Sequence, residues 1–209
     1  MTKVKICGLR TLADVEAVNR YLPEYVGFVF ADTRRFVTDE QAFLMKKALD
    51  KKIKSVGVFV DEPLAHVVCL CKNGIIDAAQ LHGSESEAYI RELKQKTDIC
   101  VIKATRVQLP RQVLQVMSDE ADYMLFDTYK KGEPGGTGER FSLEILEQCL
   151  PDMHKPFFVA GGLDCDNVLE VIGRIKCFAV DVSSGVETNG KKEEQKIKQF
   201  IEKVRGKER

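Results

Sequence analysis

The sequence lacks any excess of charge of one sign. Its 209 residues contain 32 basic and 32 acidic side chains, so the formal net charge is zero. Proteins that bind nucleic acids or membrane surfaces usually depend on surplus positive charge. We therefore expect neither a nucleic acid nor a membrane as partner, whereas a local cationic site for a small anion remains compatible with this balance.

Long apolar stretches and paired cysteine motifs are also missing. No run approaches the roughly 20 apolar residues that cross a bilayer, and the opening MTKVKICGLR lacks the apolar core of a signal peptide. The seven cysteines are an odd number and form no CxxC pair and no Cys/His group at zinc spacing. The sequence predicts a cytoplasmic protein with reduced thiols and no metal site.

Short apolar runs rich in β-branched residues recur along the chain and predict eight strands. Most runs are continuous rather than alternating, which is typical of a parallel sheet covered by helices. The predicted strands span residues 4–7, 25–30, 55–60, 78–81, 99–104, 123–127, 157–160 and 177–182.

Helical patterns fill the gaps between these runs. Helix starts are predicted at the capping-box-like patterns Thr11-x-x-Asp14, Thr38-x-x-Gln41 and Ser84-x-x-Glu87. Apolar stripes at helical spacing are formed by Leu64, Val67, Val68 and Cys71, and by Ile197, Phe200, Ile201 and Val204.

Eight strands that alternate with about eight helices predict a (β/α)8 TIM barrel, a single domain over residues 1–209. A doubly wound open sheet is the alternative. That fold usually has fewer strands, and no dinucleotide-binding fingerprint follows the first run. No linker or low-complexity stretch indicates a second domain.

A barrel of this kind collects its functional side chains at the carboxyl ends of the strands. Almost every predicted end carries a thiol, a guanidinium, an imidazole, a carboxylate or a Gly/Ser cluster. These candidates are Cys7, Arg35, His82, Asp127, Gly161, Gly162, Asp181, Ser183, Ser184 and Gly185.

Each candidate also has a structural interpretation. Cys7 can be a buried packing thiol, His82 a core histidine and Arg35 one more surface cation. Asp127 is the sharper case, because a carboxylate that closes an apolar strand is unfavourable unless it is solvated, bonded or used. If Cys7 and Asp127 both point into the barrel mouth, they form a pair that can move a proton between adjacent carbons.

The Gly/Ser clusters after the seventh and eighth strands predict a phosphate site. Gly161 and Gly162 allow a ligand to approach the backbone closely, and residues 183–185 can open a short helix whose N–H groups face an anion. Two ordinary turns are the alternative. Residues 132–138, GEPGGTG, lack a P-loop ending and are either a lid over the substrate or a solvent loop.

With these residues in place, the chain resembles the phosphoribosylanthranilate isomerase family, nearly from end to end. The resemblance is carried by KICGLR from Lys5, VGFVF from Val26, QLHG from Gln80, FDTYKKGEPGGTG from Phe126, AGGL from Ala160 and DVSSGVETNGKK from Asp181.

The resemblance implies a barrel of the ribulose-phosphate-binding type and a cofactor-free, metal-free Amadori rearrangement in tryptophan biosynthesis. It implies that Cys7 is the general base and Asp127 the general acid. It further implies that Arg35 meets the anthranilate carboxylate and that the Gly161-Gly162 and Ser183-Ser184 segments bind the phosphate. The substrate is then a small phosphosugar-anthranilate, and the enzyme a monomer or a homodimer.

One departure concerns Arg35. The family usually has Ser-Pro before this arginine, and this chain has Thr33-Arg34. Proline would stiffen the loop, so the orientation of Arg35 is less defined and Arg34 can share its role. Three rivals remain: the histidine-pathway isomerase, which has Asp where Cys7 stands; indole-glycerol-phosphate synthase, whose Lys and Glu set is not found; and a non-catalytic phosphosugar-binding barrel.

Lys5 is a further expectation from strand geometry. Side chains alternate along a strand, so Lys5 should share the inward orientation of Cys7. A lysine inside a barrel needs a carboxylate partner, which Asp127 or Asp181 can supply. Our hypothesis is that the charge of Lys5 also favours the thiolate of Cys7.

Overall fold

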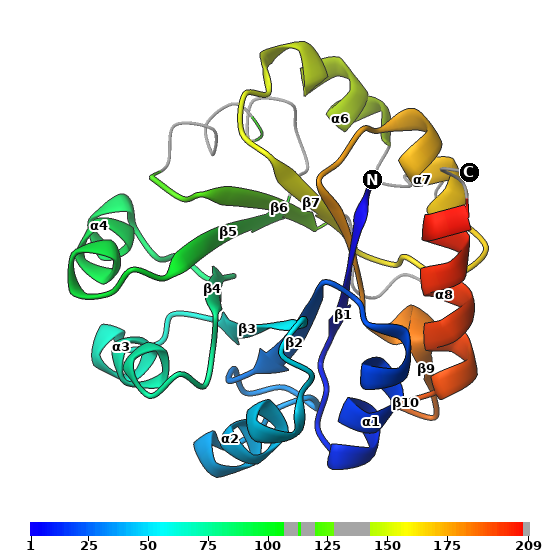
Figure 1. The fold of residues 1–209 in the computed structure, drawn as a ribbon. Coiled ribbons are helices and arrows are strands. Elements are labelled where there is room, and N and C mark those ends of the chain that lie inside the picture. Colours follow the sequence, from blue (N-terminus) through cyan, green and yellow to red (C-terminus); the bar gives the residue numbers. More distant parts are fainter. Residues whose placement is uncertain (107–112, 114–119, 128–142, 207–209) are drawn as a thin grey trace.

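The computed structural model describes residues 1–106, 113, 120–127 and 143–206. Within this part of the chain, strands β1 to β8 form a closed parallel barrel in which β8 pairs back onto β1. The helices surround the barrel on the outside (Figure 1). The closed barrel confirms the predicted fold and excludes the open doubly wound sheet. The predicted lid at residues 132–138 lies outside the described residues.

All eight predicted strands are present, and their ends fall within two residues of the prediction. The strands are β1 (Lys3–Cys7), β2 (Tyr25–Val29), β3 (Lys54–Phe59), β4 (Ala78–Leu81), β5 (Cys100–Arg106), β6 (Tyr123–Asp127), β7 (Phe157–Ala160) and β8 (Ala179–Val182). The described helices are α1 (Leu12–Tyr21), α2 (Asp39–Ala48), α3 (Leu64–Lys72), α4 (Glu87–Lys96), α6 (Leu143–Cys149), α7 (Val168–Arg174) and α8 (Glu194–Gly206), with a 3-10 turn η1 (Leu150–Asp152).

Two of the three predicted capping boxes are confirmed. Thr11 opens α1 and Thr38 opens α2, each with reciprocal side-chain bonds. The prediction at Ser84 is wrong, because Ser86 is the N-cap of α4 and accepts from the backbone N–H of Tyr89. The backbone N–H of Ser84 instead donates to Oδ1 of Asp61 at 2.6 Å, which ties it to the loop after β3.

The barrel has two apolar layers that follow from strand alternation. Outward residues such as Val4 and Ile6 pack against the helices in one large cluster, which includes the whole predicted stripe of α8. Inward residues near the strand starts form a second cluster that fills the lower barrel, with Phe158 and Phe178 at its centre. The amino-terminal part of the interior is therefore filled by side chains, which leaves the carboxyl ends of the strands for a site.

A short hairpin follows β8 at the open end. A 3-10 turn η2 (Ser184–Val186) leads into β9 (Glu187–Thr188), which pairs with β10 (Lys191–Lys192). The connecting residues Asn189 and Gly190 both have positive φ, at 52° and 73°, as the tight turns of two-residue hairpins require. Asn-Gly is the dipeptide that best satisfies this need, and it places Glu187 and Lys192 side by side.

None of the described helices is long and apolar enough to cross a membrane.

Candidate active site

Cys7 ends β1 with its side chain inside the barrel mouth, where it packs against Val29, Ala31 and Val58. The neighbouring strand has Gly27 opposite the thiol. A Cβ at Gly27 would lie 2.7 Å from Sγ of Cys7, so only glycine leaves room for this side chain. The packing interpretation of Cys7 thus accounts for its burial, but the thiol also lines the open end of the barrel.

Lys5 lies one inward position below Cys7 and is completely buried. Its Nζ donates to Oδ2 of Asp181 at 2.7 Å and to Oε1 of Gln80 at 2.9 Å. Strand alternation predicted this orientation, and of the two predicted partners Asp181 is the one that pairs with it. Burial alone would lower the pKa of Lys5, but the Asp181 carboxylate raises it, so Lys5 stays charged.

The two buried charges beneath the thiol, Lys5 and Asp181, act on its pKa in opposite directions. Burial raises the pKa of the Cys7 thiol above its usual value. The positive charge of Lys5 opposes this shift, whereas the Asp181 carboxylate adds to it. Burial likewise raises the pKa of Asp181, against the pull of Lys5. The ionisation of Cys7 is therefore coupled to the ion pair beneath it.

A polar chain continues from Lys5 to the opposite wall of the barrel. Nε2 of Gln80 lies 3.3 Å from Nδ1 of His82. An amide nitrogen can only donate, so Nδ1 accepts and the imidazole proton is assigned to Nε2. Nε2 in turn lies 3.3 Å from Oδ2 of Asp127, a close polar contact without hydrogen-bond alignment. Asp127 thus faces the mouth, as predicted.

Two buried polar atoms in this chain lack a hydrogen-bond partner among the described residues. They are Nε2 of His82 and Oδ1 of Asp181. Buried polar atoms are almost always satisfied, so an exception at an open mouth is a place where a ligand hydroxyl fits. Both residues were candidates for substrate contact.

The two glycine-rich turns after β7 and β8 lie against each other. Gly161 and Gly162 have φ of 93° and 64°, a region that favours glycine. A Cβ on Gly185 would come within 2.0 Å of the carbonyl oxygen of Leu163, so the close approach of the two turns requires glycine there too. Ser184 begins η2 as predicted, and Oγ of Ser183 donates to the carbonyl of Cys7 at 2.9 Å.

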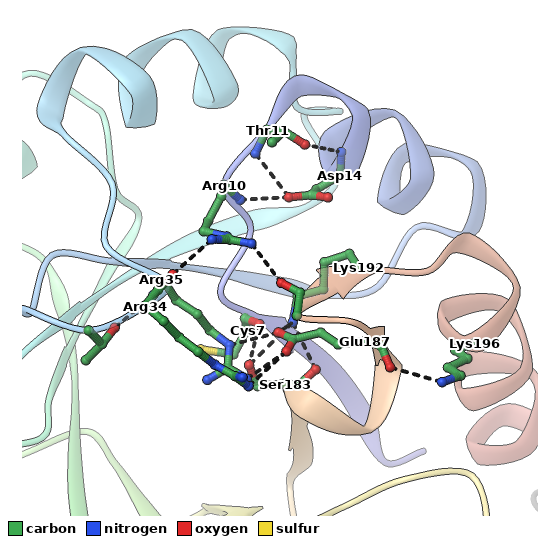
Figure 2. A network of polar contacts seen from close by, with 12 residues as sticks. Cys7, Arg10, Thr11, Asp14, Arg34, Arg35, Ser183, Glu187, Lys192 and Lys196 are labelled. Carbon is green, nitrogen blue, oxygen red and sulfur yellow. Dashed lines mark hydrogen bonds and ion pairs between the residues drawn. The ribbon is translucent and has the colours of Figure 1, made fainter.

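Arg35 lies across the turn that follows Cys7, and a Cβ on Gly8 would clash with its Cδ at 2.4 Å. It is neither free nor fully exposed, because Nε and Nη2 donate to the two carboxylate oxygens of Glu187 at 2.8 and 2.9 Å (Figure 2). Arg34 reaches the same carboxylate at 3.2 Å but is largely exposed. Of the two arginines, Arg35 is therefore the one held beside Cys7.

Glu187 and Lys192 were not among the sequence candidates. Nζ of Lys192 is almost fully buried and donates to Oε1 of Glu187 at 2.8 Å and to the carbonyl of Ser183 at 2.9 Å. Burial lowers the pKa of Lys192 and Glu187 opposes this. Burial would raise the pKa of Glu187, but hydrogen bonds from Arg35 and Lys192 hold it at about 2. The Asn189-Gly190 hairpin signal could have placed these two residues together.

An ion pair between Glu85 and Lys103 supports the loop that carries His82. The carboxylate of Glu85 accepts from Nζ of Lys103 at 3.0 Å and from the backbone N–H groups of Asp61 and Gly83. No local sequence pattern predicts this pair, whose residues are 18 positions apart. In the part of the chain that the structure describes, no group of three or more His, Cys, Asp or Glu side chains is placed to hold a metal ion.

A family model for N-(5'-phosphoribosyl)anthranilate isomerase matches residues 4–203 of this sequence. The chain belongs to this family. It is 44% identical, over 99% of both chains, to the N-(5'-phosphoribosyl)anthranilate isomerase of Thermoanaerobacter sp. strain X514. Family membership makes the protein an enzyme of the isomerase class, which the sequence resemblance predicted.

Solved structures of the phosphoribosylanthranilate isomerase family have the same barrel. A family crystal structure in complex with reduced 1-(o-carboxyphenylamino)-1-deoxyribulose 5-phosphate matches with a TM-score of 0.84 and 32% identity, over 99% of this chain and 100% of that one. Monomers generated from the dimeric enzyme of Thermotoga maritima match with a TM-score of 0.83 and 33% identity, over 99% and 100%. Relatives in this family thus include a dimer and an enzyme that binds a carboxylated phosphosugar.

Proposed function

We propose that this protein is a phosphoribosylanthranilate isomerase of tryptophan biosynthesis. It would convert N-(5-phosphoribosyl)anthranilate to 1-(2-carboxyphenylamino)-1-deoxyribulose 5-phosphate. The observation that carries the proposal is that Cys7 and Asp127 each end a strand with a side chain that faces one open mouth. The polar side chains of Lys5, Gln80 and His82 lie between them. The reaction needs one acid and one base on a single small substrate, and this mouth offers both.

In the first step, Asp127 gives its proton to the ring oxygen of the ribose. The C1–O bond breaks, and the nitrogen lone pair forms the C1=N bond of a protonated Schiff base. In the second step, the thiolate of Cys7 removes the proton on C2, the electrons of that C–H bond form the C1–C2 double bond, and the C1=N electron pair returns to nitrogen to give an enolamine. In the tautomerisation C1 gains a proton from the Cys7 thiol and the C2 hydroxyl loses one to the Asp127 carboxylate, which gives the ketone at C2. Both side chains return to their starting states, and no external reductant or oxidant is needed.

The thiol must be ionised to act as a base, and free cysteine is mostly protonated at neutral pH. Burial makes the thiolate of Cys7 still less favourable. The positive charges of Lys5 and Lys192 act against burial and lower the pKa of the thiol. We infer that these two lysines make the base usable, Lys5 from below and Lys192 from the hairpin side.

The rest of the substrate matches the other candidates. The phosphate fits the paired turns at 161–162 and 183–185, where glycines allow close backbone approach. The sugar hydroxyls fit the unpartnered atoms of His82 and Asp181. The aromatic carboxylate fits the guanidinium of Arg35, whose planar donors match a carboxylate.

A turnover assay on N-(5-phosphoribosyl)anthranilate tests the proposal with Cys7→Ala and Asp127→Asn beside the parent. Each variant should lose about 100- to 10,000-fold in kcat, the usual contribution of a general acid or base. Circular dichroism should show an intact fold, because neither change opens a large cavity. Full activity in either variant would contradict the role given to that residue, and turnover only of the histidine-pathway aminoaldose would contradict the substrate.

Three further expectations stay predictions. These are the cytoplasmic location, the single domain over residues 1–209 and a monomeric or homodimeric state. Gel filtration with light scattering decides the oligomeric state. The reaction as written also needs no cofactor and no metal, and activity after exhaustive treatment with a chelator tests the second of these.

A further inference from the structure

Glu187 contacts the proposed active site without taking part in either proton transfer. Its carboxylate is almost buried and is surrounded by Arg35, Lys192 and Arg34, all within 3.2 Å (Figure 2). Three cations around one carboxylate leave surplus positive charge at the mouth. The cluster is therefore not a closed ion pair, and its excess charge suits an anionic group on a ligand.

The backbone that carries Glu187 is fixed by several contacts. Nζ of Lys196 donates to the carbonyl of Glu187 at 3.0 Å, and β9 pairs with β10. Arg10 fastens the hairpin turn to the loop after β2, since Nη2 donates to the carbonyl of Gly190 at 2.7 Å and Nη1 to that of Arg34 at 2.9 Å (Figure 2). A glutamate on such a braced hairpin can act as a fixed point for a long side chain that has many rotamers.

Arg35 is the side chain that Glu187 holds. Its loop has Thr33-Arg34 in place of a proline, and its backbone is held by bonds from the N–H of Arg35 to Oγ1 of Thr33 at 3.1 Å and from the N–H of Phe36 to the carbonyl of Thr33 at 3.0 Å. Glu187 binds the Nε and Nη2 edge of the guanidinium. Among the described residues Nη1 of Arg35 has no hydrogen-bond partner, so this end is available for a second carboxylate.

We propose that Glu187 is a positioning residue that holds Arg35 across Gly8 so that its free end receives the aromatic carboxylate of the substrate. This proposal rests on the proposed function. It adds that Glu187, through Arg35, makes the site specific for a substrate with an aromatic carboxylate. The advantage is preorganisation: an arginine already fixed by one carboxylate loses less rotational freedom when it binds the next.

Two ligands separate this role from a purely structural one. The first is reduced 1-(o-carboxyphenylamino)-1-deoxyribulose 5-phosphate, and the second is its phenylamino counterpart without the ring carboxylate. Calorimetry on the parent should show a clear preference for the carboxylated ligand. In Glu187→Gln this preference should fall by about tenfold or more, because loss of the preorganised bidentate contact weakens one ligand and not the other. In steady-state assays KM should rise more than kcat falls.

Control variants fix the interpretation. Glu194→Gln removes a glutamate that pairs with Arg20 away from the mouth, and it should leave the ligand preference unchanged. In an Arg35→Lys background, Glu187→Gln should have no further effect on the preference, because Glu187 acts through Arg35. If Glu187→Gln does not fold, Glu187→Asp, which keeps the charge but shortens the reach, carries the same comparison with a smaller expected loss.

The outcomes are distinct. If Glu187→Gln weakens both ligands equally, or leaves their ratio unchanged, the positioning role is overturned while the proposed function stands. An additional loss in the Arg35→Lys background also overturns it. If the parent binds neither ligand and does not turn over the substrate, the proposed function itself fails.

Discussion

The two halves of the barrel interior differ in the polarity of their side chains. Near the strand starts the interior is filled by apolar side chains such as Ile102, Tyr25 and Phe158, and the rings of Tyr25 and Phe158 meet edge to face. Near the strand ends the same inward positions carry the buried charges of Lys5 and Asp181. Along β6 and β8 the change takes two residues, from Leu125 to Asp127 and from Ala179 to Asp181, although both strands continue in the same parallel pairing.

The difference shows which half is built for stability. Apolar burial contributes roughly 25 cal/mol per Å², whereas a buried ion pair contributes little net stability compared with an apolar pair of the same size. The charged half is therefore not explained by folding. Its side chains instead set the ionisation of Cys7 and leave hydrogen-bonding atoms of His82 and Asp181 open to a ligand.

The sharpest test of this contrast is Lys5→Met. Removing one partner of a buried ion pair leaves Asp181 uncompensated, so the free energy of unfolding should fall by about 3 to 5 kcal/mol. Urea denaturation measures this loss. In the folded fraction the thiol pKa of Cys7 should also rise, because the cation that opposes the effect of burial is gone. The pH dependence of Cys7 alkylation measures that shift.

Two companion variants separate charge from packing. Lys5→Met with Asp181→Leu should recover most of the lost stability, because no charge is left unpaired. Asp181→Asn should move the thiol pKa of Cys7 in the opposite direction, since the Asp181 carboxylate raises it. An unchanged thiol pKa in folded Lys5→Met would rule out electrostatic support of the thiolate by Lys5.

The halves also differ in how far the sequence could predict them. Continuous apolar runs located all eight strands, because burial on both faces leaves a strong local pattern. Strand alternation was enough to orient Lys5, and Asp181 was one of its two expected partners. These features depend on residues that are close in sequence or that occupy matching strand positions.

Features that depend on contacts distant in sequence were missed or wrong. Arg35 and Glu187 are 152 positions apart, so nothing near either residue indicates the pair. Ser84 fits the capping-box pattern, but its backbone N–H is bound by Asp61 from another loop, and the helix begins after Ser86. Local patterns compete with such tertiary contacts, and in these two places the tertiary contact decides.

A smaller effect is expected from Ile102→Val in the apolar half. Ile102 is fully buried in the lower cluster, and removal of one methylene there should lower the free energy of unfolding by about 0.5 to 1.5 kcal/mol. The kcat and the thiol pKa of Cys7 should stay unchanged, because no charge near the mouth moves. A change in the thiol pKa comparable to that of Lys5→Met would break the distinction between the two halves.

The smallest effect concerns a charge on the outside of the barrel. Nδ1 of His66 lies 2.7 Å from Glu62, and Nε2 lies 2.9 Å from Asp39 on α2. Burial would lower the pKa of His66, but the two carboxylates raise it above its usual value. Protonated His66 therefore stabilises the fold below the unfolded-state pKa of about 6.5, and this contribution is lost as the pH rises through the folded-state value.

His66→Gln should accordingly lower the free energy of unfolding by less than about 1 kcal/mol at pH 5.5, and by progressively less towards pH 9. Urea denaturation of parent and variant at both pH values measures the difference. In a background with Asp39→Asn and Glu62→Gln the pH dependence should vanish, because the carboxylates that favour the imidazolium are gone. A loss that grows with pH would mean that His66 is stabilising in its neutral form. The contacts of His66 would then differ from the Lys5–Asp181 ion pair in the charge state that stabilises the fold, and not only in their smaller contribution to stability.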